Sequence, residues 1–170
     1  MAALRLGPGL DADSEIASLV SVEERDKVAA LVEAAVAAGA RAVTGGVTPD
    51  GPGAFYPATV LADVRADADV LAHEIFGPVA PVVVVDSDEE AVRLANDTPY
   101  GLISYVYAAD LRRGLQVAEA IESGMVALNR GALSDPAAPF GGWKQSGLGR
   151  EGGFAGIHEF LETKYIALDV

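Results

Sequence analysis

An alternation of apolar runs and capped segments in the middle of this 170-residue chain most constrains its fold. Residues 79–85 are almost continuously apolar, which is typical of a strand buried on both faces. Ser87 and Asp110 each stand in an N-cap position before a helical stretch, and residues 102–108 and 125–128 are again strand-like. This order predicts two βαβ units, and therefore an α/β fold with a parallel sheet covered by helices on both faces.

The flanking parts contain further elements. Ser21 opens a capping box with Glu24, and Gly39 ends the helix that follows. Before the βαβ units, residues 42–44 and 56–64 are predicted to be extended, and residues 71–78 to form a short ordered segment. After them, residues 154–161 are at most a short amphipathic helix, and residues 163–169 are extended. One face of the first helix is predicted to carry Val28, Leu31, Val32, Ala35 and Val36, and the inward face of the helix after Asp110 to carry Leu111, Leu115, Ala118 and Ile121.

Residues 135–153 form a loop rich in glycine and proline that follows the strand at 125–128. Binding sites of open α/β sheets lie outside the carboxyl ends of strands, so this loop is the first candidate for a functional site. Residues 147–152 also match the pattern G-x-G-x-x-G. The match is interpreted as a false dinucleotide fingerprint, because a loop precedes it and the chain soon ends.

Composition narrows the class of function. The net charge is −13 and no cluster of Lys and Arg exists, which argues against nucleic-acid and anionic-membrane partners. There is no cysteine, and the two histidines are far apart, so no metal site is predicted. No segment resembles a signal peptide or a membrane span, and a cytoplasmic location is expected.

Several residues have two interpretations from the sequence alone. Glu74 and Phe76 could hold ligand hydroxyls and cover a flat ring, but an exposed Glu and a core Phe are favoured on composition. Lys144 and Arg150, with the adjacent Glu151, could bind an anion, whereas local ion pairs are the commoner outcome.

Two residues near the loop lack catalytic context. Ser134 has no nucleophile-elbow context, although a polar binding role stays open. Trp143 is interpreted as a packing residue.

Three blocks together resemble the C-terminal part of the aldehyde dehydrogenase superfamily. They are the run from Glu74 to Val79, the run from Ala95 to Leu102, and Pro139 to Gly142 followed by Lys144, Ser146-Gly147 and Gly149-Arg150-Glu151. The run from Ser134 to Gly153 is most similar to the succinate-semialdehyde dehydrogenase branch.

The resemblance implies roles for individual residues. Glu74 is expected to hold the ribose next to the nicotinamide of NAD or NADP, and Phe76 to lie beside the nicotinamide ring. Phe140 is expected to line the aldehyde pocket, with Ser134 helping to bind the substrate carboxylate. The list of expected site residues is completed by Arg150 and Glu162, which the resemblance assigns to contacts between subunits near a terminal oligomerisation strand, residues 163–169.

The resemblance also implies chemistry that this chain lacks. Members attack the aldehyde with a cysteine thiolate, transfer a hydride to NAD(P) and hydrolyse the thioester. This chain has no cysteine, and the general-base Glu and dinucleotide-binding domain are expected upstream of it. No catalytic residue is therefore assigned. The chain alone is expected to be inactive and to bind coenzyme very weakly.

Three functions follow as alternatives. The first is the C-terminal part of an NAD(P)-dependent aldehyde dehydrogenase, with an upstream-encoded half as a possible partner. In this alternative, residues 1–153 are a partial catalytic domain, and residues 154–170 are a C-terminal helix and oligomerisation strand. The second is a non-catalytic oligomerisation or regulatory module. The third is a degenerate dinucleotide-binding protein. Uncovered apolar surface predicts a homodimer or a higher homo-oligomer.

Overall fold

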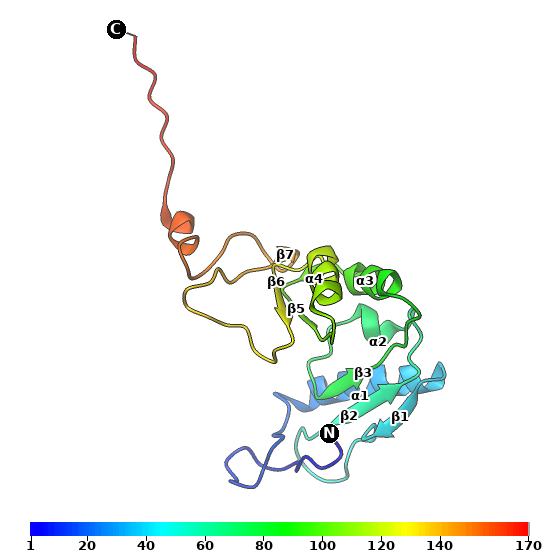
Figure 1. The fold of residues 1–170 in the computed structure, drawn as a ribbon. Helices are drawn as coiled ribbons and strands as arrows, with labels where there is room; N and C mark the ends of the chain where they lie inside the picture. Colours follow the sequence, from blue (N-terminus) through cyan, green and yellow to red (C-terminus); the bar gives the residue numbers. More distant parts are fainter. Residues whose placement is uncertain (170) are drawn as a thin grey trace. The chain divides into compact units, whose positions relative to one another are not determined.

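The computed structural model describes residues 1–169 and resolves the chain into two compact units (Figure 1). The first unit is Met1–Val85 and the second is Asp86–Val170. Both combine helices with small sheets, so the predicted α/β class is confirmed. The functional boundary expected at residue 153 stays a prediction. Among the described residues, none of the helices is both long and apolar enough to span a membrane.

The first unit begins its regular structure with helix α1, Val22–Ala37. Ser21 has an extended backbone, and its side chain accepts a hydrogen bond from Glu24 N at 3.2 Å, which confirms the predicted N-cap. Gly39 follows the helix with φ +108°, a conformation that glycine adopts without steric cost. The capped helix presents Val28 and Val32 to the core.

Three short strands form the sheet of the first unit. They are β1 (Arg41–Thr44), β2 (Thr59–Ala62) and β3 (Val79–Pro81), in the order β1-β2-β3. The β1–β2 pair is antiparallel and the β2–β3 pair is parallel. The strand expected over 79–85 is therefore shorter than predicted, and its described partner is β2.

The core of the first unit lies between this sheet and two helices, α1 and the four-residue α2 (Asp69–Ala72). Leu61 of β2 is fully buried there, and Tyr56 is 1% exposed. Burial raises the pKa of the Tyr56 phenol, and the negative charge of Glu33 raises it further. The cluster is built mainly from small apolar side chains: Val28, Val32, Ala35, Ala40, Tyr56, Leu61, Val64 and Val70.

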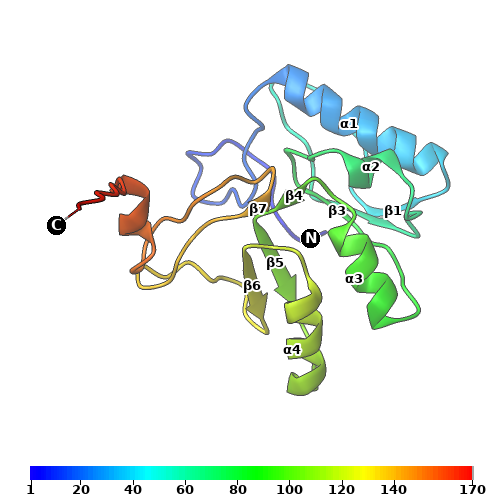
Figure 2. The ribbon, with the colours of Figure 1, turned by 90° about the horizontal axis from the view of Figure 1, so that it is seen from above.

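The second unit contains the elements that carry the glycine-rich loop. In chain order they are α3 (Asp88–Asn96), β4 (Tyr100–Gly101), β5 (Ile103–Val106), α4 (Leu111–Ala120), β6 (Met125–Leu128), β7 (Trp143–Lys144) and the 3₁₀ helix η1 (Gly156–Phe160). Strands β5 and β6 pair in parallel, and α4 lies alongside them (Figure 2). The segment β5–α4–β6 is thus one of the two predicted βαβ units.

Both helices of this unit start at the predicted caps. Ser87 accepts from Glu90 N at 3.1 Å, and Asp110 accepts from Arg113 N at 2.8 Å. Arg113 also ties the two helices together, because its Nη2 donates to Asp88 Oδ1 at 2.6 Å. These hydrogen bonds from the guanidinium lower the pKa of the Asp88 carboxyl.

The inward face of α4 agrees with the prediction at Ala118 and Ile121 but not at the two leucines. Leu111 and Leu115 are 62% and 48% exposed, whereas Gly114 and, just after the helix, Ile121 are buried. A Cβ at Gly114 would lie 2.8 Å from Leu128 Cδ1, so the helix approaches β6 through the glycine. The face that packs is therefore rotated away from the two leucines.

The glycine-rich loop is ordered by its own pairings. Strand β7 pairs antiparallel with β4, and Phe140 and Glu151 exchange two backbone hydrogen bonds of 2.7 and 2.8 Å. The dinucleotide interpretation of residues 147–152 gains no support, because the helix that follows them is only the short 3₁₀ helix η1. Gly147, Gly149 and Gly152 all have positive φ. After η1, residues 161–169 belong to no helix or strand; they are exposed and follow an extended path (Figure 1).

Candidate functional site

An open hollow of about 410 Å³ lies beside α1 in the first unit. Two residues predicted to contact a coenzyme, Glu74 and Phe76, line it together. The Phe76 ring is 67% exposed, so the core position favoured on composition is wrong. Opposite them, α1 contributes one face of the helix, composed of Glu24, Lys27, Val28, Ala30, Leu31 and Ala34.

The local sequence explains why Glu74 and Phe76 face this hollow. Ile75 between them is partly buried and packs against the core, so its two neighbours point outward. Gly77 then turns the chain, donating to Ile75 O at 2.8 Å. A Cβ on Gly77 would lie 2.9 Å from Val28 Cγ2, so glycine allows this segment to approach α1 closely. The pattern Glu-Ile-Phe-Gly thus builds one wall of the hollow.

Lys27 supplies the hollow with a cation that the sequence analysis missed. Its Nζ donates to Glu24 Oε1 at 2.7 Å and lies 3.5 Å from Glu23 Oε1. The hydrogen bond to Glu24 raises the pKa of the Lys27 ammonium, so the group is charged at neutral pH. Glu24 was interpreted only as part of a capping box. Helical spacing was the available signal, because positions 24, 27, 28 and 31 share one face.

The hollow therefore combines an exposed aromatic face, a free carboxylate and a cation. Carboxylates accept hydrogen bonds from hydroxyl groups, and aromatic rings cover flat heterocycles. His73 also lines it, with Nδ1 3.0 Å from Asp69 O. This set of groups fits a ligand that carries hydroxyls, an aromatic ring and negative charge.

A second hollow, of about 520 Å³, lies in the second unit against the glycine-rich loop. Phe140 and Arg150 both line it, together with Glu159 and Phe160. The Arg150 guanidinium is directed onto its own loop, since Nη1 donates to Gly142 O at 3.0 Å and to Gly149 O at 2.6 Å. The predicted pocket residue Phe140 is therefore held by a loop that is closed by hydrogen bonds.

The remaining predicted residues lie outside both hollows. Ser134 is exposed on the loop that leads from β6 towards Phe140, and Glu162 is exposed on the extended segment after η1. Lys144 forms an ion pair with Glu122 at 2.7 Å, the local pairing that the sequence favoured over an anion site. Trp143, which the sequence indicated as a packing residue, is 48% exposed, so that interpretation is not supported.

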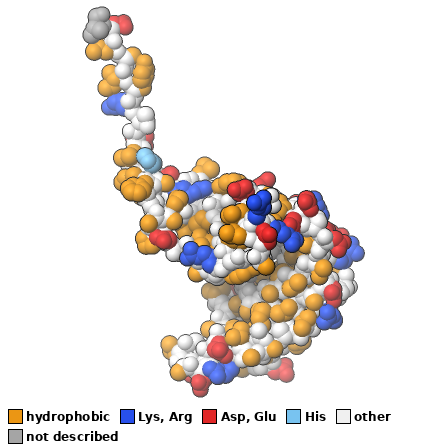
Figure 3. All heavy atoms as spheres, in the orientation of Figure 1, with side chains coloured by type: hydrophobic (Ala, Val, Ile, Leu, Met, Phe, Trp, Pro, Cys, Tyr) orange, Lys and Arg blue, Asp and Glu red, His pale blue; other side chains and the backbone are white. Residues whose placement is uncertain are grey.

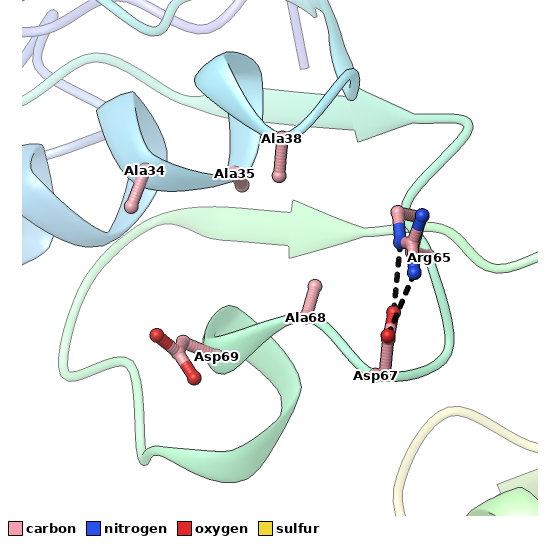
Figure 4. A pocket seen from close by; sticks show the side chains of 7 residues that line it. All are labelled: Ala34, Ala35, Ala38, Arg65, Asp67, Ala68 and Asp69. Carbon is pink, nitrogen blue, oxygen red and sulfur yellow. Dashed lines mark hydrogen bonds and ion pairs between the residues drawn. The ribbon is translucent and has the colours of Figure 1, made fainter.

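Figure 4 shows a third, smaller hollow of about 230 Å³ at the end of α1. Ala34 and Ala35 of that helix and Ala38 just after it form one side, and Arg65, Asp67 and Asp69 line the rest. Arg65 donates to both carboxylate oxygens of Asp67, at 2.8 and 2.7 Å, which lowers the pKa of the Asp67 carboxyl. The cation is thus already paired. Across residues 1–169, no group of three or more His, Asp or Glu side chains is arranged to hold a metal ion.

Comparison with known sequences assigns these features to one family. Residues 1–166 match the sequence profile of the aldehyde dehydrogenase family. The chain belongs to the aldehyde dehydrogenase family. A succinate-semialdehyde dehydrogenase of Paenarthrobacter nicotinovorans is 55% identical over 168 residues, which are 99% of this chain and 37% of that protein.

Solved aldehyde dehydrogenase structures have the same fold. Succinate-semialdehyde dehydrogenase from Burkholderia pseudomallei superposes with a TM-score of 0.88 at 44% identity, covering 92% of this chain and 33% of that one. Betaine aldehyde dehydrogenase from Staphylococcus aureus, solved in complex with NAD⁺, gives 0.87 at 37% identity and covers 96% and 33%. The chain spans about a third of the length of these aldehyde dehydrogenases.

Proposed function

We propose that this chain carries coenzyme and aldehyde contacts of an NAD(P)-dependent semialdehyde dehydrogenase. The observation that carries the proposal is the hollow that Glu74 and Phe76 line together with Lys27 of α1. Its donor, acceptor and aromatic groups suit the nicotinamide-ribose part of a dinucleotide. When bound, that coenzyme supplies an acceptor for the hydride removed from the aldehyde.

Each side chain of the hollow has a distinct role in this proposal. Glu74 accepts hydrogen bonds from ribose hydroxyls through an exposed carboxylate that has no need to be freed from a partner first. Phe76 covers one face of the nicotinamide ring and excludes water from it. Lys27 exchanges part of its contact with Glu24 for a negatively charged or hydroxyl oxygen of the coenzyme.

The aldehyde contacts lie on the second unit. Phe140 provides an apolar wall of the pocket, and Ser134 donates to the carboxylate of a semialdehyde. Succinate semialdehyde is the proposed substrate, because the 55% identical relative is a succinate-semialdehyde dehydrogenase. The chemical step requires a cysteine thiolate, and the 170-residue sequence has no cysteine. The proposal therefore includes a second segment that supplies the thiol, and no turnover by this chain alone.

The coenzyme contact can be tested on the chain as it is. Saturation-transfer NMR with NAD is expected to give signals from the nicotinamide protons, with a dissociation constant on the order of millimolar because only part of a dinucleotide site is present. Phe76→Ala should raise the dissociation constant for NAD by roughly 2- to 10-fold, which corresponds to the usual contribution of an aromatic pair. Glu74→Gln should reduce transfer to the ribose protons.

Phe154→Ala is the matched control, since Phe154 is also an exposed aromatic but lies in the second unit. Its spectra should equal those of the unsubstituted chain. Equal transfer in Phe76→Ala, or a loss in Phe154→Ala alone, would contradict the placement of the nicotinamide in the α1 hollow.

A self-association role is favoured by a separate feature, the extended segment 161–169. Figure 3 shows hydrophobic side chains along it, and Ile166 and Leu168 are 77% and 79% exposed. An unpaired extended segment with apolar side chains at alternate positions is suited to join the sheet of a second copy. We therefore include a homodimer or a higher homo-oligomer in the proposal, with Arg150 and Glu162 near the contact.

The double substitution Ile166→Asp with Leu168→Asp is expected to lower the mass measured by light scattering at micromolar concentration to that of a monomer. Two buried carboxylates in the contact would each carry a desolvation cost. Val20→Asp, at an exposed site in the first unit, should leave the mass unchanged. If the unsubstituted chain is itself a monomer, the proposed self-association is wrong.

A further inference from the structure

The block from Ala95 to Leu102 is one of the three that carry the family resemblance, but no role was assigned to it from the sequence. Its contacts indicate one. Lys144 Nζ donates to Asn96 O at 2.7 Å and to Thr98 O at 3.2 Å. The same atom forms the ion pair with Glu122 Oε2 at 2.7 Å. An ammonium group has three donors, so all three are used.

The acceptors of Lys144 are themselves fixed. The Asn96 amide Nδ2 donates to Ala120 O at 3.0 Å, and its Oδ1 accepts from Glu122 N at 2.8 Å. The Asn96 side chain therefore joins the end of α3 to the end of α4. The last carbonyls of a helix carry partial negative charge, which favours a cation at this point. Lys144 thus closes a junction where two helices end.

The backbone around Lys144 is arranged to aim its side chain at this junction. Lys144 has φ +55°, a left-handed conformation that is unfavourable for a residue other than glycine and persists only where the surroundings impose it. Ser146 Oγ accepts from Gly101 N at 3.0 Å, and Gln145 N donates to Pro99 O at 2.9 Å. These bonds hold the left-handed turn in place.

We propose that Lys144 is the positioning residue that fixes the glycine-rich loop, and with it Phe140, to the ends of α3 and α4. Lys144 does not line the hollow that contains Phe140, so it acts through the backbone of the loop. We call the contacts of Lys144 with Asn96 O, Thr98 O and the Glu122 carboxylate the lock, and the distances above are its evidence. Its meaning for the aldehyde pocket rests on the proposed function, in which Phe140 is a wall of that pocket.

A surface ion pair alone would not act in this way, since exposed pairs contribute little. The Lys144 side chain is 24% exposed, and two of its three acceptors are backbone carbonyls. Removing the ammonium leaves those carbonyls and the Glu122 carboxylate without their partner. The loop then loses the contact that compensates its strained turn.

Amine labelling of the unsubstituted chain tests the lock directly, because the sequence has only Lys27, Lys144 and Lys164. Reaction with an N-hydroxysuccinimide ester, followed site by site by mass spectrometry, should modify Lys144 at least about tenfold more slowly than Lys164, since charged hydrogen bonds must open first. Lys27, held by carboxylates alone, should fall between them. Equal rates at Lys144 and Lys164 would overturn the proposal.

Substitution gives a second, independent readout. Trp143 is the only tryptophan of the chain and precedes Lys144 directly, so its fluorescence reports on the turn. Lys144→Met has similar length without the charge and should shift the emission to the red and accelerate hydrogen exchange at the Phe140 and Glu151 amides. Lys144→Arg should restore both, and Lys164→Met, the control, should change neither.

Unchanged emission and exchange in Lys144→Met would refute the lock. Loss of rescue by Lys144→Arg would also count against it, because a cation that reaches the same carbonyls is what the proposal requires. None of these readouts depends on coenzyme or aldehyde. If these readouts agree with the proposal but NAD gives no saturation-transfer signal, the lock is supported and the proposed function is wrong.

Discussion

The 170-residue chain, mixed with succinate semialdehyde and either NAD or NADP, is expected to produce no reduced nicotinamide. The sequence contains no cysteine, and the covalent step of the family requires a thiolate. Binding groups such as Glu74 and Phe140 orient the reactants but form no bond to the aldehyde carbon. Removal of an enzyme nucleophile lowers turnover by about 10⁴-fold or more, which places any residual rate below detection.

Joining the chain to a thiol-bearing segment should restore the reaction. The appropriate donor is the part of the Paenarthrobacter nicotinovorans relative that this chain does not match, placed upstream, because the matched part is 55% identical. Turnover on the order of 1–10³ s⁻¹ is then expected, the common range for enzymes. Absorbance of the reduced nicotinamide measures it.

The control for this experiment is the same fusion with the nucleophilic cysteine of the donor replaced by alanine, which should be as inactive as the chain alone. Turnover by the pure, mass-verified 170-residue chain above a mock-purified sample would mean that another group replaces the thiolate. An inactive but folded fusion would contradict the proposal that this chain carries the remaining contacts of the enzyme.

Helix starts were predictable from the sequence because their causes are local. Ser21, Ser87 and Asp110 each accept from a backbone N–H three residues ahead, and this interaction needs nothing from the rest of the chain. The β5–α4–β6 unit was predictable for a related reason, since the connection between parallel strands follows general rules. Local chemistry therefore accounts for the elements that were placed correctly.

Packing partners were harder to predict. The apolar run at 79–85 indicates a buried strand, but periodicity does not say which strand it joins, and β3 pairs with β2 from before α2. On α4, Leu111 and Leu115 gave the expected apolar face, whereas contact with β6 is made where Gly114 permits close approach. A glycine inside a helix contributes nothing to a hydrophobic pattern, so the pattern indicated a neighbouring face.

The candidate sites show the same division. Glu74 and Phe76 were found through resemblance, and the geometry explains them through Ile75 and Gly77. Lys27 was missed because a lysine on a capped helix has an ordinary explanation as a surface residue. The lock at Lys144 joins residues 48 positions apart, and only the fold brings such groups together.

Gly124→Ala is expected to be strongly destabilising, because Gly124 lies against the glycine-rich loop at Gly141 and Gly142. Gly124 lies between α4 and β6, and its N–H donates to Gly101 O at 2.9 Å. A Cβ there would overlap the Gly141 carbonyl oxygen and lie 2.9 Å from Gly142 Cα. Both neighbours are backbone atoms, which cannot rotate away as a flexible side chain can. Either the loop must leave its place or the start of β6 must shift.

The expected cost is about 3 kcal/mol, the upper part of the range for overpacking. For a unit of this size it corresponds to a fall in Tm of roughly 10 °C or more. Thermal unfolding followed by Trp143 fluorescence measures it in the second unit. Gly131→Ala is the matched control, because a Cβ there would meet nothing closer than the Tyr107 hydroxyl at 3.7 Å and should change stability by at most about 0.5 kcal/mol. If the two variants have the same Tm, the position of the loop does not depend on the close approach at Gly124. A loss confined to Gly124→Ala supports a loop held from two sides, by this close backbone approach and by Lys144.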